Sequence, residues 1–301
     1  MSPAWDGLLL LDKPSGPTSH DLVDRVRRAT GERRVGHAGT LDPLASGLLP
    51  LVLGRATRLV RFLPASPKAY EGVLRLGLTT RTDDVAGEVL ARHDGELPSG
   101  ARVLAAAGRL AGDHLQRPPA VSARKVGGRR LYRLARQGLV VEAEPRAVSV
   151  YRFELAELPD DPARFSFEAE VSGGTYVRSL VRDLGQDLGC GAIVTSLRRT
   201  AIGPMRPSPG LSVDPEGGVD ADRLLQHLVA LEDMPLCVPP FRLREAADAV
   251  RFAAGAAFSI GPTDLPDGPC RILDAEGRLL GVADHLQGIV RPRVVLVPGR
   301  A

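Results

Sequence analysis

A cluster of prolines divides the 301-residue chain into two parts with different local patterns. It lies in EDMPLCVPP, residues 232–240, and beyond it the sequence has only short strand patterns separated by turns. Prolines lack a backbone donor and favour extended connections, so they are typical of linkers between domains. We therefore predict one domain over residues 1–232 and a smaller, β-rich domain over residues 236–301.

The first part mixes strand and helix patterns, which predicts an α+β domain. Apolar runs predict strands at residues 7–11, 70–78, 148–155 and 164–171. Capping residues and apolar spacing predict helices at residues 18–31, 101–111 and 220–231. In GGTYVRSLVRDLGQDLG the glycines lead into another helix, with one apolar face made of Val177, Leu180, Val181, Leu184 and Leu188.

The second part contains CRILDAEGRLLGVA, in which two apolar runs flank turn residues. This pattern predicts a β-hairpin. The three cysteines of the whole chain are far apart and form no C-x-x-C pair, which favours neither a disulfide framework nor a zinc site and is typical of a reducing cytoplasm. No apolar run approaches the roughly 20 residues that a membrane span needs, and we expect a cytoplasmic protein without membrane contact.

The net charge of +3 allows a nucleic-acid partner without requiring one, so the distribution of charge matters more. Residues 117–136 hold seven basic residues and no acid: Arg117, Arg124, Lys125, Arg129, Arg130, Arg133 and Arg136. This density indicates a surface for a nucleic-acid backbone, with an ordinary solvated basic face as the alternative.

The loop GHAGTLDPLASG, residues 36–47, displays a single carboxylate among small residues. Asp42 precedes Pro43, and a residue before proline is driven from helical towards extended geometry. The small neighbours allow another molecule to approach closely, while the alternative is that Asp42 only forms a turn. A Walker A loop is excluded because His37 and Ala38 stand where Lys and Ser/Thr belong.

Asp83 and Asp84 could suggest a metal site, but adjacent acids in the segment TTRTDDVAGE are more typical of a turn.

GHAGTLDPLASGLL closely resembles the motif II loop of the TruB family of tRNA pseudouridine synthases. Four further segments resemble that family in the same order: GLLLLDKPSGPTS, SPKAYEGVLRLGLTTRTDDVAGE, PPAVSARKVGGRRLYRLARQG and VSGGTYVRSLVRDLGQDLGCGAIVTSLRRTAIG. The resemblance covers residues 7 to about 204. The last ~65 residues resemble a PUA-type RNA-binding domain through their hairpin pattern and position.

The resemblance implies the pseudouridine synthase fold, with a large, mainly antiparallel mixed sheet, flanking helices and a small C-terminal PUA-like β-barrel. It implies isomerisation of the T-loop uridine of tRNA, position 55, to pseudouridine. The family needs no metal and no cofactor. We expect the T arm of tRNA as the partner, no required protein partner, and a monomer.

The resemblance also implies residue roles. Asp42 matches the catalytic aspartate, Arg178 the arginine that pairs with it, and Tyr70 the active-site tyrosine. His37 matches the histidine that fills the gap left by the flipped nucleotide. The other residues assigned to substrate binding are Gly39, Thr40, Lys125, Tyr176 and Leu197. Those assigned to the RNA backbone are Arg124, Arg129, Arg130 and Arg133.

Several alternatives remain open at this level. Asp42 can attack C1′ of the ribose, attack C6 of the base, or assist a glycal route. The hydroxyl of Tyr70 is a possible proton acceptor but a poor base without help. Val121 replaces the usual tyrosine of the family, and Asp84 is a less certain match to a family acid. The rival functions are an RNA-binding module without catalysis and a related synthase that is guided by RNA in a protein complex.

Overall fold

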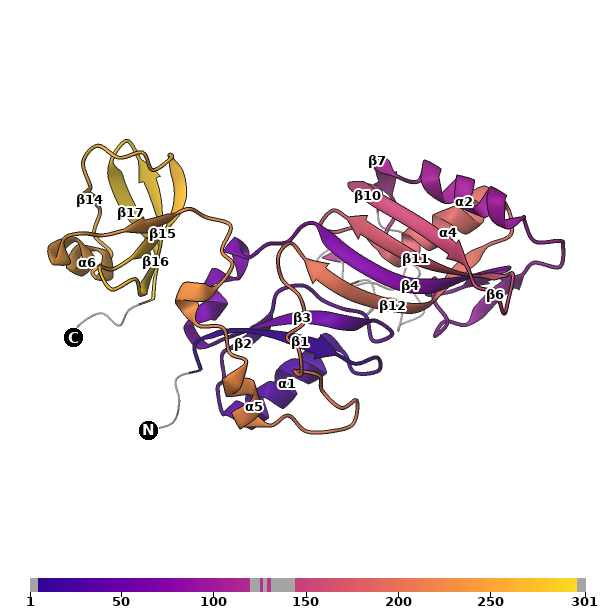
Figure 1. The fold of residues 1–301 in the computed structure, drawn as a ribbon, viewed down its shortest axis with the longest axis horizontal. Helices are drawn as coiled ribbons and strands as arrows, with labels where there is room; N and C mark the ends of the chain where they lie inside the picture. Colours follow the sequence, from indigo (N-terminus) through magenta and orange to yellow (C-terminus); the bar gives the residue numbers. More distant parts are fainter. Residues whose placement is uncertain (1–4, 120–124, 127–128, 131–143, 297–301) are drawn as a thin grey trace.

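The computed structural model describes residues 5–119, 125–126, 129–130 and 144–296 (Figure 1). The chain forms an elongated molecule with a large eight-stranded sheet and, at one end, a five-stranded sheet built from the C-terminal residues (Figure 1). Two small ribbons, β5 (Leu78–Thr80) with β6 (Val89–Arg92) and β8 (Lys125–Val126) with β9 (Arg129–Arg130), complete the described strands.

The large sheet has the strand order β1-β3-β12-β4-β11-β10-β7, and β2 pairs with β3 beside this path. All of its pairings are antiparallel except that of β3 with β12. The mainly antiparallel α+β fold predicted from the sequence is therefore confirmed. The strands are β1 (Gly7–Lys13), β2 (Val35–His37), β3 (Ser46–Leu53), β4 (Lys68–Leu76), β7 (Gly112–Gln116), β10 (Arg146–Glu157), β11 (Arg164–Val171) and β12 (Ala192–Ile202).

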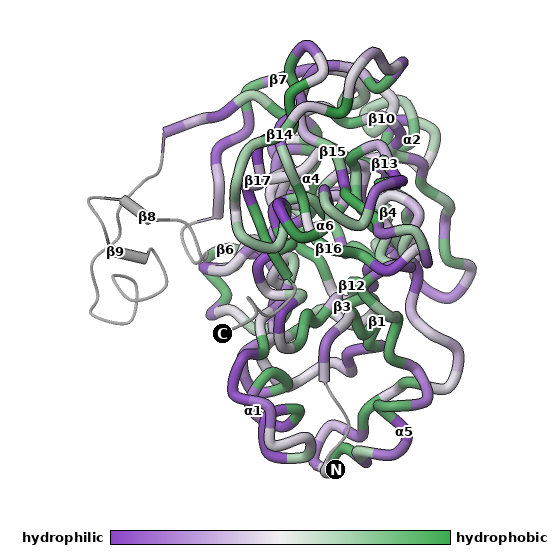
Figure 2. The backbone as a smooth tube through the Cα atoms, turned by 90° about the vertical axis from the view of Figure 1, so that its left-hand side faces the viewer, coloured by the Kyte–Doolittle hydropathy of each residue, from purple (hydrophilic) through white to green (hydrophobic). Residues whose placement is uncertain are grey.

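The first helix starts and stops where its capping residues predict. In α1 (Ser19–Thr30), Thr18 and Asp21 form a reciprocal capping box, and Gly31 ends the helix with a φ of 71°. Purple and green segments alternate along α1 in Figure 2, as expected for a helix with one apolar face. Next to β10 lies α2 (Gly100–Arg109), and α4 (Val177–Leu188) packs its predicted apolar face against β12.

One predicted helix is much shorter than expected. The pattern at residues 220–231 predicts three turns, but α5 (Ala221–Gln226) ends early. Val229 instead pairs with Leu8, at the edge of β1, through backbone hydrogen bonds of 3.0 and 2.9 Å. The prediction was wrong because the buried backbone groups of this edge strand need partners, and residues near position 229 supply them.

The C-terminal sheet has the order β13-β15-β16-β17-β14 and is covered by α6 (Ala246–Ala253). The predicted hairpin is the antiparallel pair β15–β16. Closure into a barrel and PUA-like character stay predictions. The strands are β13 (Pro240–Arg242), β14 (Phe258–Ser259), β15 (Gly268–Leu273), β16 (Leu279–Leu286) and β17 (Ile289–Val295).

The two sheets share a buried apolar cluster next to the short 3-10 helix η1 (Gly54–Phe62). Leu59 and Phe62 of η1 belong to it together with Val294 and Leu296 of the C-terminal part. Arg55 donates a 2.8 Å hydrogen bond to the carbonyl of Leu296. The C-terminal sheet is therefore packed on the large one, and the boundary at residues 232–236 stays a prediction.

Gly47→Ala is expected to destabilise the protein by about 2–4 kcal/mol. Gly47 has a φ of 96°, and an added Cβ would lie 2.2 Å from the carbonyl oxygen of Arg199 in the paired strand. Gly108→Ala is the matched control, because that position in α2 has open space and a helical backbone. Thermal unfolding would measure both, and equal Tm values for the two variants would contradict the prediction.

Within the described ranges, no helix combines the length and the apolar character that crossing a bilayer requires.

Candidate active site

A cavity of about 210 Å³ lies between the Asp42 loop, strands β4 and β12, and the start of α4. It brings together six of the residues singled out in the sequence, which come from four separate segments: Thr40, Asp42, Tyr70, Tyr176, Arg178 and Leu197. The cavity is smaller than the ~300–1,000 Å³ typical of drug-sized ligand sites. Its size therefore suits a single base better than a longer stretch of nucleic acid.

The loop that carries Asp42 is anchored by α1. The Ser19 hydroxyl, in the first turn of α1, accepts a 2.9 Å hydrogen bond from the amide of Leu41 and donates a 3.0 Å bond to its carbonyl. Asp42 lies outside any helix, as its place before Pro43 predicts. The backbone turns directly afterwards, where the amide of Ala45 donates to the carbonyl of Asp42.

A buried lysine holds the same loop from the end of β1. The ammonium of Lys13 donates to the carbonyls of Pro14, Pro43 and Ala45 at 2.8, 3.3 and 2.6 Å. Burial lowers the pKa of Lys13 to about 8, although the nearby charge of Asp42 opposes this shift. The sequence interpretation placed Lys13 in the family-like segment GLLLLDKPSGPTS but gave it no role in the site.

A second buried cation, Arg199 of β12, holds the other side of the loop. Its guanidinium donates to the carbonyls of Gly39, Thr40 and Leu48 at 2.9, 3.3 and 2.7 Å. Arg199 has no exposed surface, so these carbonyls replace the water it would otherwise bind. This role was also missed, since SLRRT shows two adjacent arginines without indicating which one is buried.

Asp42 and Arg178 form an ion pair at the cavity wall. The Nε and Nη2 atoms of Arg178 lie 2.9 and 2.8 Å from Oδ2 of Asp42. Both contacts use one carboxylate oxygen, and in the described part of the chain Oδ1 accepts no hydrogen bond. The carboxylate thus binds Arg178 rather than the backbone of its own turn, and its side chain stays 36% exposed. Arg178 therefore fixes one oxygen of a carboxylate that lines the cavity.

Arg178 itself is held by a second acid. Its Nη1 atom lies 3.4 Å from Oδ2 of Asp84 and donates to the carbonyl of Thr82 at 2.6 Å. The neighbouring acid, Asp83, instead pairs with Arg182 at 3.2 Å. The adjacent acids therefore lie in a turn and serve two arginines. Among the described residues, no three His, Cys, Asp or Glu side chains gather as metal ligands would.

Tyr70 lines the cavity from the first half of β4, with only 8% of its surface exposed. Burial raises the pKa of its hydroxyl above the ordinary value, while the guanidinium of Arg199 beside it opposes that shift. The tyrosine is therefore neutral at physiological pH. Leu197 lies close by on β12, where it pairs with Gly72.

The start of α4 is held in place by a side chain from β7. Gln116 accepts a 2.8 Å hydrogen bond from the amide of Tyr176 and donates a 3.1 Å bond to its carbonyl. This amide clamp sets the first turn of α4, which carries Arg178. Gln116 was not singled out in the sequence and carries no local signal.

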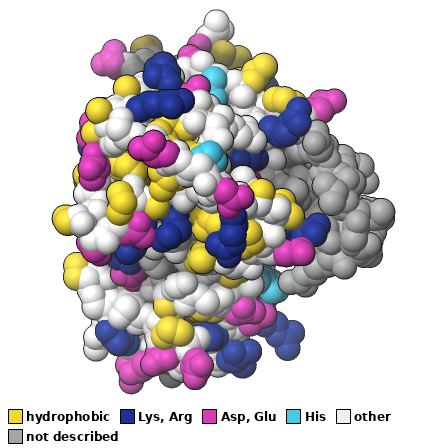
Figure 3. All heavy atoms as spheres, turned by 90° about the vertical axis from the view of Figure 1, so that its right-hand side faces the viewer, with side chains coloured by type: hydrophobic (Ala, Val, Ile, Leu, Met, Phe, Trp, Pro, Cys, Tyr) yellow, Lys and Arg dark blue, Asp and Glu magenta, His cyan; other side chains and the backbone are white. Residues whose placement is uncertain are grey.

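Several candidates do not reach the cavity or cannot be placed. His37 ends β2 opposite Leu51 and does not line the cavity, and neither does Gly39. Arg124, Arg133 and Val121 lie outside the described residues. Lys125, Arg129 and Arg130 have a described backbone in the β8–β9 ribbon, and their side chains are not described. Figure 3 views the molecule from the right-hand side of Figure 1. On this face, the described basic and acidic side chains are interspersed.

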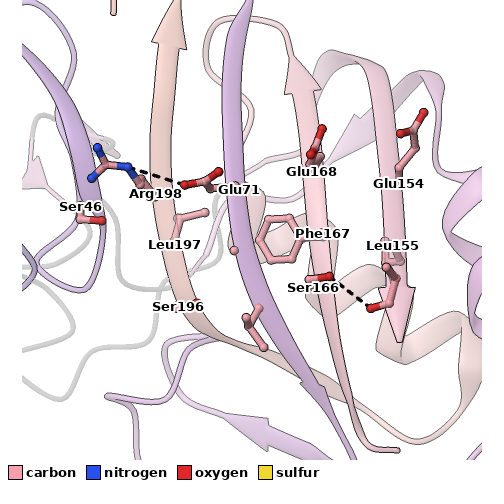
Figure 4. Close-up of a pocket in the computed structure, with 13 residues that line it drawn as sticks. Ser46, Glu71, Glu154, Leu155, Ser166, Phe167, Glu168, Ser196, Leu197 and Arg198 are labelled. Carbon is pink, nitrogen blue, oxygen red and sulfur yellow. Dashed lines mark hydrogen bonds and ion pairs between the residues drawn. The ribbon is translucent and has the colours of Figure 1, made fainter. Parts of the chain in front are cut away.

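A larger hollow of about 640 Å³ lies on the opposite face of the sheet (Figure 4). Glu71 follows Tyr70 along β4, and successive side chains of a strand point to opposite faces. Glu71, Glu154 and Glu168 line this hollow, with Arg198 at its edge. Three carboxylates disfavour a polyanion, so a nucleic acid would approach the smaller cavity on the Asp42 side.

Comparisons with known proteins agree with this geometry. The sequence model of the TruB family pseudouridylate synthase N-terminal domain matches residues 27–177, and that of the tRNA pseudouridylate synthase B C-terminal domain matches residues 178–216. The chain is 42% identical to tRNA pseudouridine synthase B of Thermobifida fusca (strain YX), over 96% of this chain and 98% of that protein. It is 40% identical to tRNA pseudouridine synthase B of Mycobacterium bovis (strain BCG / Pasteur 1173P2), over 99% of this chain and 98% of that protein.

Among solved structures, the chain is similar to one from the crystal structure of a Cbf5-Nop10-Gar1 complex. The TM-score is 0.71 at 25% identity, and the match covers 98% of this chain and 86% of the other. Sequence and structural similarity therefore extend over nearly the whole chain, including the Asp42 cavity. The chain belongs to the TruB family of pseudouridylate synthases.

Proposed function

We propose that this protein is a tRNA pseudouridine synthase that isomerises the T-loop uridine at position 55. The observation that carries the proposal is Asp42, which lines a base-sized cavity while its Oδ2 is fixed by Arg178 and its side chain stays 36% exposed. A fixed, partly exposed carboxylate suits attack on an electrophilic carbon and later departure. Family membership and relatives named tRNA pseudouridine synthase B support the same activity.

The reaction breaks the bond between N1 of uracil and C1′ of the ribose and forms one between C5 and C1′. The proton on C5 is released, and N1 gains one. Asp42 serves as the nucleophile, at C1′ or C6, or assists a glycal route. Arg178 stabilises the carboxylate and orients it, and the ring of Tyr70 provides a surface on which the base stacks.

The target base must leave its stack before it can enter the cavity, because that cavity lies within the protein surface. We propose that His37 occupies the gap left in the RNA and that Thr40, Tyr176 and Leu197 line the bound base. Lys125, with Arg124, Arg129, Arg130 and Arg133, is proposed to bind the RNA backbone. The C-terminal sheet is proposed to be a PUA-like domain that adds affinity for tRNA.

The proposed activity is tested with an unmodified T-arm stem-loop that carries tritium at C5 of its uridines. The purified protein is incubated with this RNA in EDTA, and released tritium is counted. Release proportional to enzyme supports a synthase that needs neither metal nor protein partner. Binding without release would favour the RNA-binding module or a synthase that needs a guide and partners. Size-exclusion chromatography of the same sample tests the proposed monomer.

Tyr70→Phe is expected to lower kcat by roughly 100-fold while KM stays within about threefold. The ring that stacks on the base remains, but the neutral hydroxyl beside Arg199 is lost as a hydrogen-bonding group that positions the base for reaction. Steady-state tritium release with the stem-loop measures both constants. Phe153→Leu, in the apolar core of the sheet and away from the cavity, is the control for general effects on packing. An unchanged kcat in Tyr70→Phe would exclude a role for the hydroxyl.

A further inference from the structure

Lys68 lines the Asp42 cavity but has no part in the mechanism described so far. It lies on β4 two residues before Tyr70, so both side chains point to the same face of the sheet. Tyr70 is buried, whereas Lys68 is partly exposed. Lys68 therefore lies nearer the mouth of the cavity, and Tyr70 lies at its floor.

The ammonium of Lys68 has no hydrogen bond or ion pair with any described residue, in contrast to the other cations around the cavity. Arg178 binds Asp42 and Asp84, and Lys13 and Arg199 bind backbone carbonyls. The one charged group that shifts the pKa of Lys68 is the Arg199 guanidinium from β12. Tyr70 and Asp42 line the same cavity, and the charge of Asp42 is already matched by Arg178. A half-buried cation without a counter-ion is unfavourable until an anion joins it.

We propose, on the basis of the proposed function, that Lys68 binds a phosphate that flanks the flipped uridine. Uracil is neutral, so the backbone phosphates are the only anions that the nucleotide brings. A base that stacks on Tyr70 at the floor leaves its sugar-phosphate at the mouth, where Lys68 lies. An ammonium is a common ligand for phosphate, since it offers a compact charge and three donors.

The protonation of Lys68 fits this role. Burial and the charge of Arg199 lower its pKa to about 8, so the amine is mostly protonated at neutral pH and loses its proton in mildly alkaline solution. A phosphate beside the ammonium would favour the charged form. RNA binding should thus be strong below pH 8 and weaken above it, because only the protonated lysine attracts the phosphate.

The test combines protein variants with backbone-modified RNA. Lys68→Met removes the charge and keeps the length of the side chain, whereas Lys68→Arg keeps a charge that does not titrate below pH 12. Arg109→Met is the control, because it removes one exposed positive charge of α2 outside the cavity. Each protein is assayed for tritium release on stem-loops in which the phosphate 5′ or 3′ of the target uridine is a neutral methylphosphonate.

Lys68→Met is expected to raise KM roughly 10- to 100-fold with kcat within about threefold, as for the loss of one charge-assisted contact. With one of the two methylphosphonate substrates, wild type and Lys68→Met should have the same KM, which identifies the phosphate. The KM of wild type should rise above pH 8, while that of Lys68→Arg should stay constant to pH 9.5. Arg109→Met should resemble wild type on every substrate.

Two results would overturn the inference while wild type still releases tritium. If the effect of Lys68→Met persists on both neutral substrates, the lysine contacts neither phosphate. If Lys68→Met lowers kcat and leaves KM unchanged, and the wild-type rate rises above pH 8, the neutral amine acts as a base. No release by wild type would mean that the proposed function has failed. Direct binding of the stem-loop, measured at pH 7 and pH 9, would then decide whether Lys68 still contributes to RNA affinity.

Discussion

Asp42→Asn is expected to lower tritium release from the T-arm stem-loop by at least ~10³-fold while RNA binding is retained. The amide has nearly the shape of the carboxylate, so its oxygen can still accept from Arg178 at the position of Oδ2. It lacks the negative charge that makes Oδ1 a nucleophile. The substitution therefore removes the chemistry and leaves the cavity and the RNA surface in place.

Single-turnover tritium release and equilibrium binding of the stem-loop measure the two parts of this prediction. Asp94→Asn is the matched control, because it makes the same change in charge at an exposed loop position. Equal release by Asp42→Asn and wild type would mean that Asp42 is only a turn residue. Loss of binding together with release would mean that the carboxylate contributes to the structure of the RNA site.

Arg178→Met is expected to abolish activity and to destabilise the protein by about 3–5 kcal/mol, which corresponds to a fall in Tm of roughly 6–20 °C. The guanidinium is 5% exposed and serves two carboxylates, Asp42 and Asp84. Asp84 is almost as buried, so the substitution leaves its charge without a counter-ion. Asp42 is more exposed and loses its orientation rather than its solvation.

A double variant separates the two roles of Arg178. Arg178→Met combined with Asp84→Asn removes the unpaired buried charge, so much of the lost stability should return. Activity should stay absent, because nothing then orients Asp42. Thermal unfolding and tritium release are measured on the same preparations. Recovery of activity in the double variant would show that Arg178 acts only through folding, and no recovery of stability would show that the pair with Asp84 is unimportant.

Much of the site could be predicted because its signals are local. The place of Asp42 before Pro43 predicts a loop, and the structure has one there. Thr18 and Gly31 predict the ends of α1 through capping and left-handed backbone geometry. The apolar spacing predicts α4, whose first turn carries Arg178. Each of these features depends on residues within a few positions of one another, so the sequence contains all the information needed.

The supporting cations could not be predicted because their partners are remote. Lys13 reaches carbonyls about 30 residues away, and Arg199 reaches carbonyls about 150–160 residues away. Their acceptors are backbone oxygens, which every residue has, so no side-chain pattern marks them. Lys68 lies in the family-like segment SPKAYEGVLRLGLTTRTDDVAGE, but nothing local shows that it lines the cavity. The early end of α5 has the same kind of cause, a backbone contact with β1.

The sequence by itself determined the chemical groups of this protein: a lone loop carboxylate, a tyrosine on a strand, an arginine in a first helical turn, and family membership. Only the tertiary structure decided that these groups meet, since Asp42 and Arg178 are 136 positions apart and pair through one oxygen. It also decided which charges are buried and which acid each arginine serves. Burial and long-range contact depend on how the sheet brings distant segments together, and local patterns do not encode that distance.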